Sequence, residues 1–198
     1  MNILVILGHP NPDSLNHAIA ARVVSTLEAL GHAVTFHDLH DEGFDPILSS
    51  GEERRGAKLP PEIQAHCDQV RAADGIVVVH PNWWGMPPAI LKGWVDRVLR
   101  VDVAYRFEEF DGGEGVPVGL LQARRAVVFN TSNTPLNREV DVFGDPLETL
   151  WKNCIFDLCG VREFHRRMFE VVCLSTAQHR TKWLDEVEGT VRRLFPKA

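Results

Sequence analysis

The fold is decided by the stretch Ile76-Val-Val-Val-His80-Pro-Asn-Trp-Trp-Gly85-Met-Pro-Pro88. Its first four residues form an unbroken apolar run, which is typical of a strand buried on both faces of a parallel sheet. The loop that follows is stiffened by prolines. Residues 88–99 then carry apolar side chains at helical spacing. A strand, a loop and a helix in this order are the repeating unit of an α/β protein.

The rest of the chain repeats this alternation. The predicted strands are residues 3–7, 33–37, 76–79, 126–129 and a stretch within 163–172. The predicted helices are residues 14–30, 61–72, 88–99, 147–158 and 175–195. Such alternation implies right-handed crossovers and helices on both faces of a parallel sheet. We expect a single α/β domain over residues 1–198, a flavodoxin-like three-layer sandwich with a five-stranded parallel sheet in the order 2-1-3-4-5.

Two segments interrupt the pattern and are predicted to be excursions from the domain. They are residues 39–59 and residues 102–122. The second contains Asp111-Gly112-Gly113-Glu114-Gly115, a glycine-rich run that is typical of a surface turn.

The composition excludes some classes of function. The formal net charge of −6 argues against a general nucleic-acid binder, which would present a basic face. The first apolar run is too short for a signal or membrane segment. The cysteines form no C-x-x-C pair, so we expect reduced thiols and a cytoplasmic location. They are Cys67, Cys154, Cys159 and Cys173.

Ligands of open α/β sheets bind beyond the carboxyl ends of the strands, near the point where the strand order reverses. Three loops are expected there. The first, residues 8–16, matches neither G-x-G-x-x-G nor a P-loop. Ser14, Asn16 and the free amides of the first helical turn can hold a phosphate. An ordinary capped loop is an equal alternative for this segment taken alone.

The second loop, residues 80–88, carries Trp83 and Trp84 side by side, although solvated loops rarely hold such large apolar rings. Gly85 allows a tight turn or a close approach to a ligand. Aromatic rings and free backbone amides in a stiff loop suit a flat heteroaromatic ligand. The alternative is that both tryptophans anchor the core.

The third loop, residues 130–135, consists of small polar residues before a proline and can line the polar edge of a ring. Taken alone it is a plain polar loop. The three loops together predict a flavin site without a catalytic side chain and without a metal. The candidate cofactor-binding residues are His9, Ser14, Leu15, Asn16, Pro81, Asn82, Trp83, Trp84, Gly85, Asn130, Thr131, Ser132 and Asn133.

Other residues suggest chemistry that we do not expect. His32, His37 and His40 are interpreted as surface histidines, because a metal site needs oriented ligands with outer partners. The run His165-Arg166-Arg167 can attract a phosphate, but a solvated charge cluster is the favoured interpretation. No G-x-S-x-G motif is present, so serine hydrolase chemistry is unsupported.

These motifs resemble the NAD(P)H:quinone oxidoreductase family. The resemblance lies in Gly8-His9-Pro10 with Ser14-Leu15-Asn16, in the whole segment 80–99, and in Ala104-Tyr105. It covers the first 130 residues well and the remainder loosely. It implies a non-covalent flavin that NADH or NADPH reduces and a quinone or similar acceptor reoxidises, by ping-pong hydride transfer. It also implies a homodimer with the active site at the subunit interface.

By the same resemblance, His9, Ser14, Leu15 and Asn16 face the phosphates. Pro81 to Gly85 hold the isoalloxazine, with Trp84 beside the ring. We expect FMN because the chain is short, with FAD as the alternative.

The resemblance fails after the fourth predicted strand. The family commonly has a Thr-Thr-Gly-Gly type loop followed by a tyrosine and a histidine, whereas this chain has residues 130–139 with no counterpart of either. Arg138 offers a positive charge instead. The acceptor therefore stays open. Two alternatives remain: a flavin-bound regulatory subunit of a potassium efflux system, with a membrane transporter as partner, and an electron-carrier flavodoxin.

Overall fold

The computed structural model describes residues 1–108 and 115–197. Its main sheet has five parallel strands in the order β2-β1-β3-β6-β7. These strands are β1 (Asn2–Leu7), β2 (Ala33–Asp38), β3 (Gly75–Pro81), β6 (Arg125–Thr131) and β7 (Glu163–Phe169). Numbered among themselves they follow the predicted order 2-1-3-4-5, so the flavodoxin-like α/β fold is confirmed.

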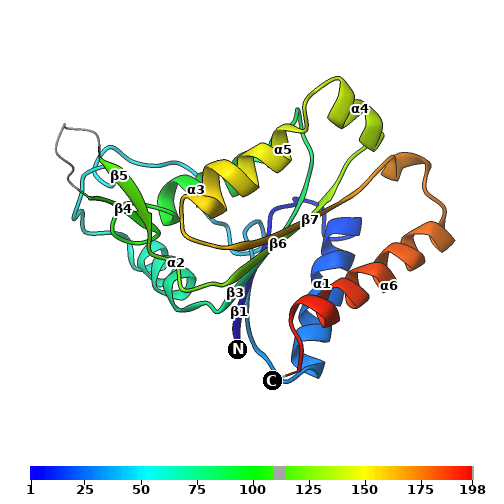
Figure 1. The fold of residues 1–198 in the computed structure, drawn as a ribbon, viewed down its shortest axis with the longest axis horizontal. Coiled ribbons are helices and arrows are strands. Elements are labelled where there is room, and N and C mark those ends of the chain that lie inside the picture. Colours follow the sequence, from blue (N-terminus) through cyan, green and yellow to red (C-terminus); the bar gives the residue numbers. More distant parts are fainter. Residues whose placement is uncertain (109–114, 198) are drawn as a thin grey trace.

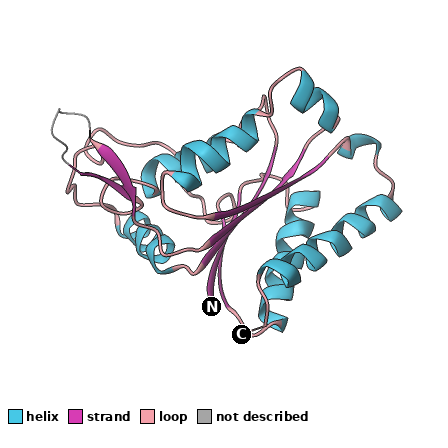
Figure 2. Cartoon of the chain, in the orientation of Figure 1, coloured by secondary structure: helices cyan, strands magenta, loops and turns pink. Residues whose placement is uncertain are grey.

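Helices cover both faces of this sheet (Figures 1 and 2). One face carries α1 (Leu15–Ala29) and α6 (Ala177–Leu194). The other carries α2 (Pro61–Ala72), α3 (Ala89–Val98) and α5 (Pro146–Glu148), which continues into the π-helical stretch η1 (Thr149–Asp157). None of the helices that the structure describes is long and apolar enough to cross a membrane.

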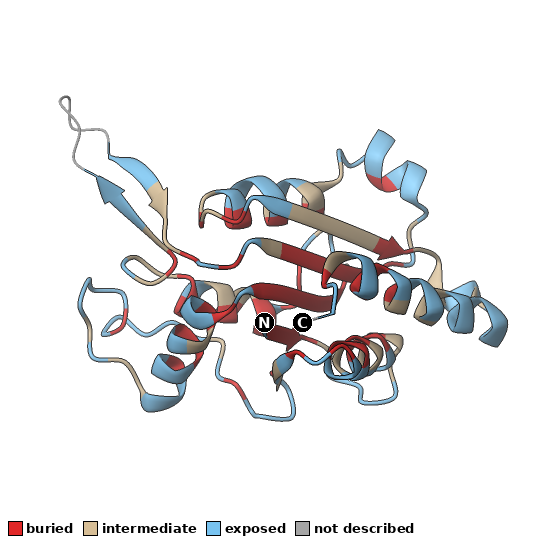
Figure 3. Cartoon of the chain, turned by 60° about the horizontal axis from the view of Figure 1, so that its bottom comes forward, coloured by how far each residue is buried: buried red, intermediate tan, exposed pale blue. Residues whose placement is uncertain are grey.

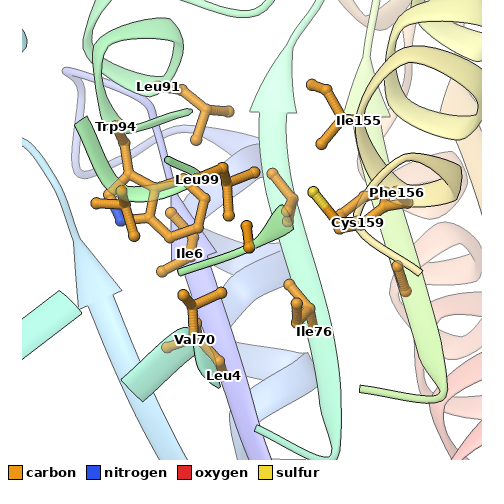
Figure 4. Packing of buried hydrophobic residues seen from close by; sticks show 14 of the residues in the cluster. Leu4, Ile6, Val70, Ile76, Leu91, Trp94, Leu99, Ile155, Phe156 and Cys159 are labelled. Atoms are coloured by element: carbon orange, nitrogen blue, oxygen red, sulfur yellow. The ribbon is translucent and has the colours of Figure 1, made fainter. Parts of the chain in front are cut away.

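The strand sequences explain this three-layer arrangement. Successive side chains of a strand point to opposite faces, and both faces are buried here (Figure 3). In β1, Leu4 and Ile6 pack into the cluster beneath α2, α3 and η1, where Trp94 lies (Figure 4). Ile3 and Val5 pack on the opposite face against α1 and α6.

Three parts of the fold differ from the prediction. The segment 102–122 contains an antiparallel hairpin outside the main sheet, β4 (Tyr105–Glu108) and β5 (Val116–Gly119). The turn predicted at residues 111–115 lies outside the described residues except for Gly115. A short helix, α4 (Leu136–Asp141), follows the polar loop after β6, and a 3-10 turn, η2 (Val172–Leu174), follows β7.

Candidate flavin site

A pocket of about 870 Å³ opens at the carboxyl ends of β1, β3 and β6, at the point where the strand order reverses. All the residues predicted to bind the cofactor line it, except Asn130. The lining residues that were not among the predicted cofactor-binding residues are Asn11, Thr134, Glu139, Phe143, Pro146 and Val172.

The first wall is the loop before α1. Ser14 is the N-cap of this helix, and its Oγ accepts a hydrogen bond from the His17 amide at 3.2 Å. Leu15 and Asn16 begin the helix, so their amides have no acceptor within it and remain free for an anion. His9 lies beside this end, with its ring centroid 6.1 Å from that of Trp83. Burial is the main reason why the pKa of His9 is lowered, so His9 is neutral at pH 7.

Asn16 joins this wall to the end of β6. Its buried side chain donates from Nδ2 to Thr131 Oγ1 at 3.0 Å. The bond fixes the start of α1 relative to the third loop. Asn16 therefore offers its amide N–H to the pocket, while its side chain holds the pocket together.

The second wall is a tight turn from Trp83 to Met86, closed by two backbone hydrogen bonds of 3.0 Å each. The turn requires positive φ at Trp84 (+60°) and Gly85 (+72°). Trp84 is fully exposed at its tip and Trp83 is 45% exposed, so neither anchors the core. The tryptophans buried in the core are Trp94 and Trp151 instead.

Hydrogen bonds of Asn82 hold the start of this turn. The Asn82 amide donates to the Thr131 carbonyl at 2.6 Å, and Asn82 Oδ1 accepts from the Gly85 amide at 2.9 Å. Behind them, His80 is completely buried. Its Nε2 accepts from Trp151 Nε1 at 2.9 Å, and its Nδ1 lies 2.8 Å from the Pro81 carbonyl, to which it donates. Both ring nitrogens are therefore used to position the loop.

Burial lowers the pKa of His80 and the pKa of His66 to about 4, well below their ordinary value of 6.5. Between pH 6.5 and 4 the unfolded chain binds protons at these groups that the folded chain does not. The contribution of these two histidines to the free energy of unfolding is therefore fully present above pH 6.5 and is lost as the pH drops toward 4. The loss is roughly 2 kcal/mol for each histidine at pH 5. Urea unfolding at pH 7 and pH 5 measures this loss, and His66→Gln is expected to remove about half of it. An equal free energy of unfolding at both pH values would contradict the assignment.

The third wall is the loop after β6. The Ser132 amide donates to the Phe169 carbonyl at 2.9 Å, and the Val172 amide donates to the Ser132 carbonyl at 3.1 Å. These bonds tie the loop to the end of β7. The Thr134 amide donates to Ser132 Oγ at 3.0 Å, which leaves a compact polar edge along the pocket.

Asn130 lies in the interior and does not line the pocket. Its Oδ1 accepts from Arg166 Nη1 at 3.0 Å. The Arg166 side chain is only 6% exposed and also pairs with Asp145 and Glu148. The prediction of a solvated cluster at residues 165–167 is therefore wrong for Arg166, because its side chain is buried and its guanidinium is bound by Asn130 and two carboxylates.

Of the three histidines near β2 that were predicted to lie on the surface, His40 is exposed as expected and His32 is not. His32 is buried, not on the surface, and its Nε2 lies 3.3 Å from the Phe195 carbonyl. His37, Glu42 and His66 bring possible metal ligands within 4.8 Å of one another. Trp94, however, donates from its indole to His66 Nδ1, which places the imidazole proton on the Nε2 that a metal would need.

The pocket suits a flat heteroaromatic ligand with a phosphate. Free amides and a neutral histidine lie at one end, Trp83 and Phe143 provide aromatic surface, and small polar groups line one edge. The titratable side chains among its described lining residues are His9 and Glu139.

Known proteins share this architecture. The chain matches the family model described as flavodoxin-like fold over residues 1–188. An uncharacterized NAD(P)H oxidoreductase of Haemophilus influenzae is 38% identical over 175 residues, which cover 85% of this chain and 83% of that protein. Human ribosyldihydronicotinamide dehydrogenase (quinone) is 28% identical over 183 residues, covering 81% and 77%. A crystal structure from Streptococcus mutans is 31% identical, with a TM-score of 0.83 and coverage of 98% and 100%.

Proposed function

The chain belongs to the family with the flavodoxin-like fold, and on that premise we propose that it is a flavin-dependent NAD(P)H oxidoreductase whose acceptor is a quinone or a similar compound. One observation carries the proposal. Free amides at the start of a helix, an aromatic turn and a polar edge come from three separate loops and meet in one pocket at the switch point of the sheet.

The start of α1 holds the phosphate of the flavin. The amides of Leu15 and Asn16 are the donors, and the helix dipole favours negative charge at this end. The Ser14 hydroxyl is engaged with His17, whose Nδ1 lies 2.9 Å from Ser14 Oγ, so Ser14 acts as the helix cap beside the phosphate. The neutral imidazole of His9 adds a further hydrogen-bonding group.

The turn from Asn82 to Gly85 holds the isoalloxazine, with Trp83 and Phe143 limiting access of water to it. When bound, the flavin accepts a hydride from NADH or NADPH and passes two electrons to the acceptor. The protein contributes position and exclusion of water, and no side-chain nucleophile is needed. His80 takes no part in proton transfer, because it is fully buried and both its ring nitrogens are engaged.

The reaction is tested in two anaerobic steps. NADH or NADPH added to the flavin-loaded protein is expected to bleach the visible flavin absorbance, and a quinone added next is expected to restore it. The nucleotide that reduces the flavin faster is the better hydride donor. Failure of both nucleotides to reduce the bound flavin would rule out the proposed reaction.

We propose FMN as the flavin, since a phosphate monoester uses all the donors at the start of α1.

We also propose that the protein is located in the cytoplasm. The structure describes all four cysteines and none forms a disulfide, which is consistent with a reducing compartment.

A homodimer is supported by apolar side chains exposed around the pocket. Soluble monomers rarely expose such groups together. They are Trp83, Trp84, Met86, Leu136, Val140, Val142, Phe143 and Leu174.

A substitution at Val142 can test the dimer without disturbing the pocket, because Val142 is 66% exposed and does not line the pocket. Val142→Asp is expected to weaken the dimer by at least tenfold, since it buries a charge at the interface. Sedimentation velocity over a range of concentrations measures the change. Ile47→Asp, on an exposed residue of another segment, is the control. A wild-type protein that sediments as a monomer at every concentration would exclude the dimer.

A further inference from the structure

Glu139 is a nearly buried carboxylate in the wall of the pocket, and the proposed function gives it no role. It lies in α4, is 4% exposed, and lines the pocket. None of the ion pairs formed by the described residues includes it. A carboxylate is costly to bury without a cation, so its retention here requires specific hydrogen bonds.

Those hydrogen bonds lead directly to the turn that holds the ring. Glu139 Oε1 accepts from Asn82 Nδ2 at 2.8 Å and from Ser132 Oγ at 3.4 Å. With Nδ2 held in this way, Asn82 must present Oδ1 to the Gly85 amide, which it does at 2.9 Å. Glu139 thus fixes the orientation of the Asn82 side chain, and through it the shape of the turn.

The second carboxylate oxygen faces a different environment. Glu139 Oε2 forms no hydrogen bond with any of the described residues, although the side chain lines the pocket. Because the Glu139 side chain is almost fully buried, water screens its charge weakly. A negative charge in this place opposes the negative charge that a flavin gains on reduction.

We propose that Glu139 is a positioning residue with two effects on the bound flavin: through Asn82 it holds the turn in its binding shape, and by its charge it lowers the reduction potential. The inference rests on the proposed function. The carboxylate weakens binding of the reduced flavin relative to the oxidised flavin, so it favours transfer of both electrons onward to the acceptor.

Two substitutions separate the two effects. Glu139→Gln keeps an oxygen for Asn82 but removes the charge. It is expected to leave the Kd of the oxidised flavin within about threefold of wild type. It should strengthen binding of the reduced flavin about tenfold, which raises the two-electron midpoint potential by about 30 mV. Glu139→Ala also removes the acceptor for Asn82, and is expected to weaken binding of the oxidised flavin about tenfold.

The measurements are fluorescence titration for the Kd and anaerobic titration against a reference dye for the potential. Asp141→Asn is the matched control, because it removes one exposed carboxylate from the same short helix. It should change neither quantity. Three results would overturn the inference: an unchanged potential in Glu139→Gln, an unchanged Kd in Glu139→Ala, or the same shift in Asp141→Asn. A wild-type protein that binds no flavin would instead refute the proposed function.

Discussion

Gly85→Ala is expected to weaken flavin binding by roughly 30-fold, or about 2 kcal/mol. Gly85 has φ of +72°, a conformation that costs an L-residue roughly 1–2 kcal/mol. A Cβ at this position would also lie 2.7 Å from Pro146 Cγ, so the turn or the start of α5 must move. Gly85 and Pro146 both line the pocket, so the displacement changes the shape of the surface that is proposed to hold the flavin ring.

Gly144→Ala is the control for this prediction. Gly144 has almost the same φ, +71°, but a Cβ added there would meet no atom within 4 Å, and the residue does not line the pocket. This variant should lose stability in urea unfolding without a loss of flavin affinity. Equal flavin affinities of Gly85→Ala and wild type, by fluorescence titration, would show that the turn does not hold the ring.

Ser14→Asp is expected to weaken FMN binding about 100-fold while riboflavin binding stays the same. Aspartate caps a helix as well as serine does, so α1 keeps its N-cap. A carboxylate about 4 Å from a phosphate opposes it by roughly 4 kcal/mol per pair of unit charges near a protein surface. Riboflavin has the same ring without the phosphate and does not feel this repulsion.

Ser14→Ala is the comparison. It removes the helix cap without adding a charge, and should weaken both ligands by no more than about tenfold. Parallel titrations give the Kd of FMN and the Kd of riboflavin for each variant, and the ratio of the two Kd values separates an effect on the phosphate from an effect on the fold. If Ser14→Asp weakens both ligands equally, the substitution acts through the fold and the phosphate lies elsewhere.

The sheet and its helices were predictable because their signals are local. The apolar runs at residues 3–7 and 76–79 allow burial on both faces, and alternation with helices then leaves few topologies. The hairpin was missed because each strand has only four residues and Pro117 interrupts the second. The helix α4 was missed because six residues after a proline carry too short a periodic pattern.

The site was predictable where a loop directly follows a strand. His9, Ser14 and Trp83 reach the pocket because the carboxyl ends of the strands fix where their loops lie. Glu139 was not predictable, since its position depends on how the chain folds back after β6. Asn130 was misplaced for a different reason: it still belongs to β6, and its side chain lies beneath the pocket and not inside it.

The most direct test of a flavin in this pocket is the mass of the chromophore. The protein is purified, the chromophore is released by denaturation, and its mass and its molar ratio to the chain are determined. We expect one FMN for each chain, and apoprotein that takes up added FMN again. A colourless protein that binds neither FMN nor FAD would contradict the account.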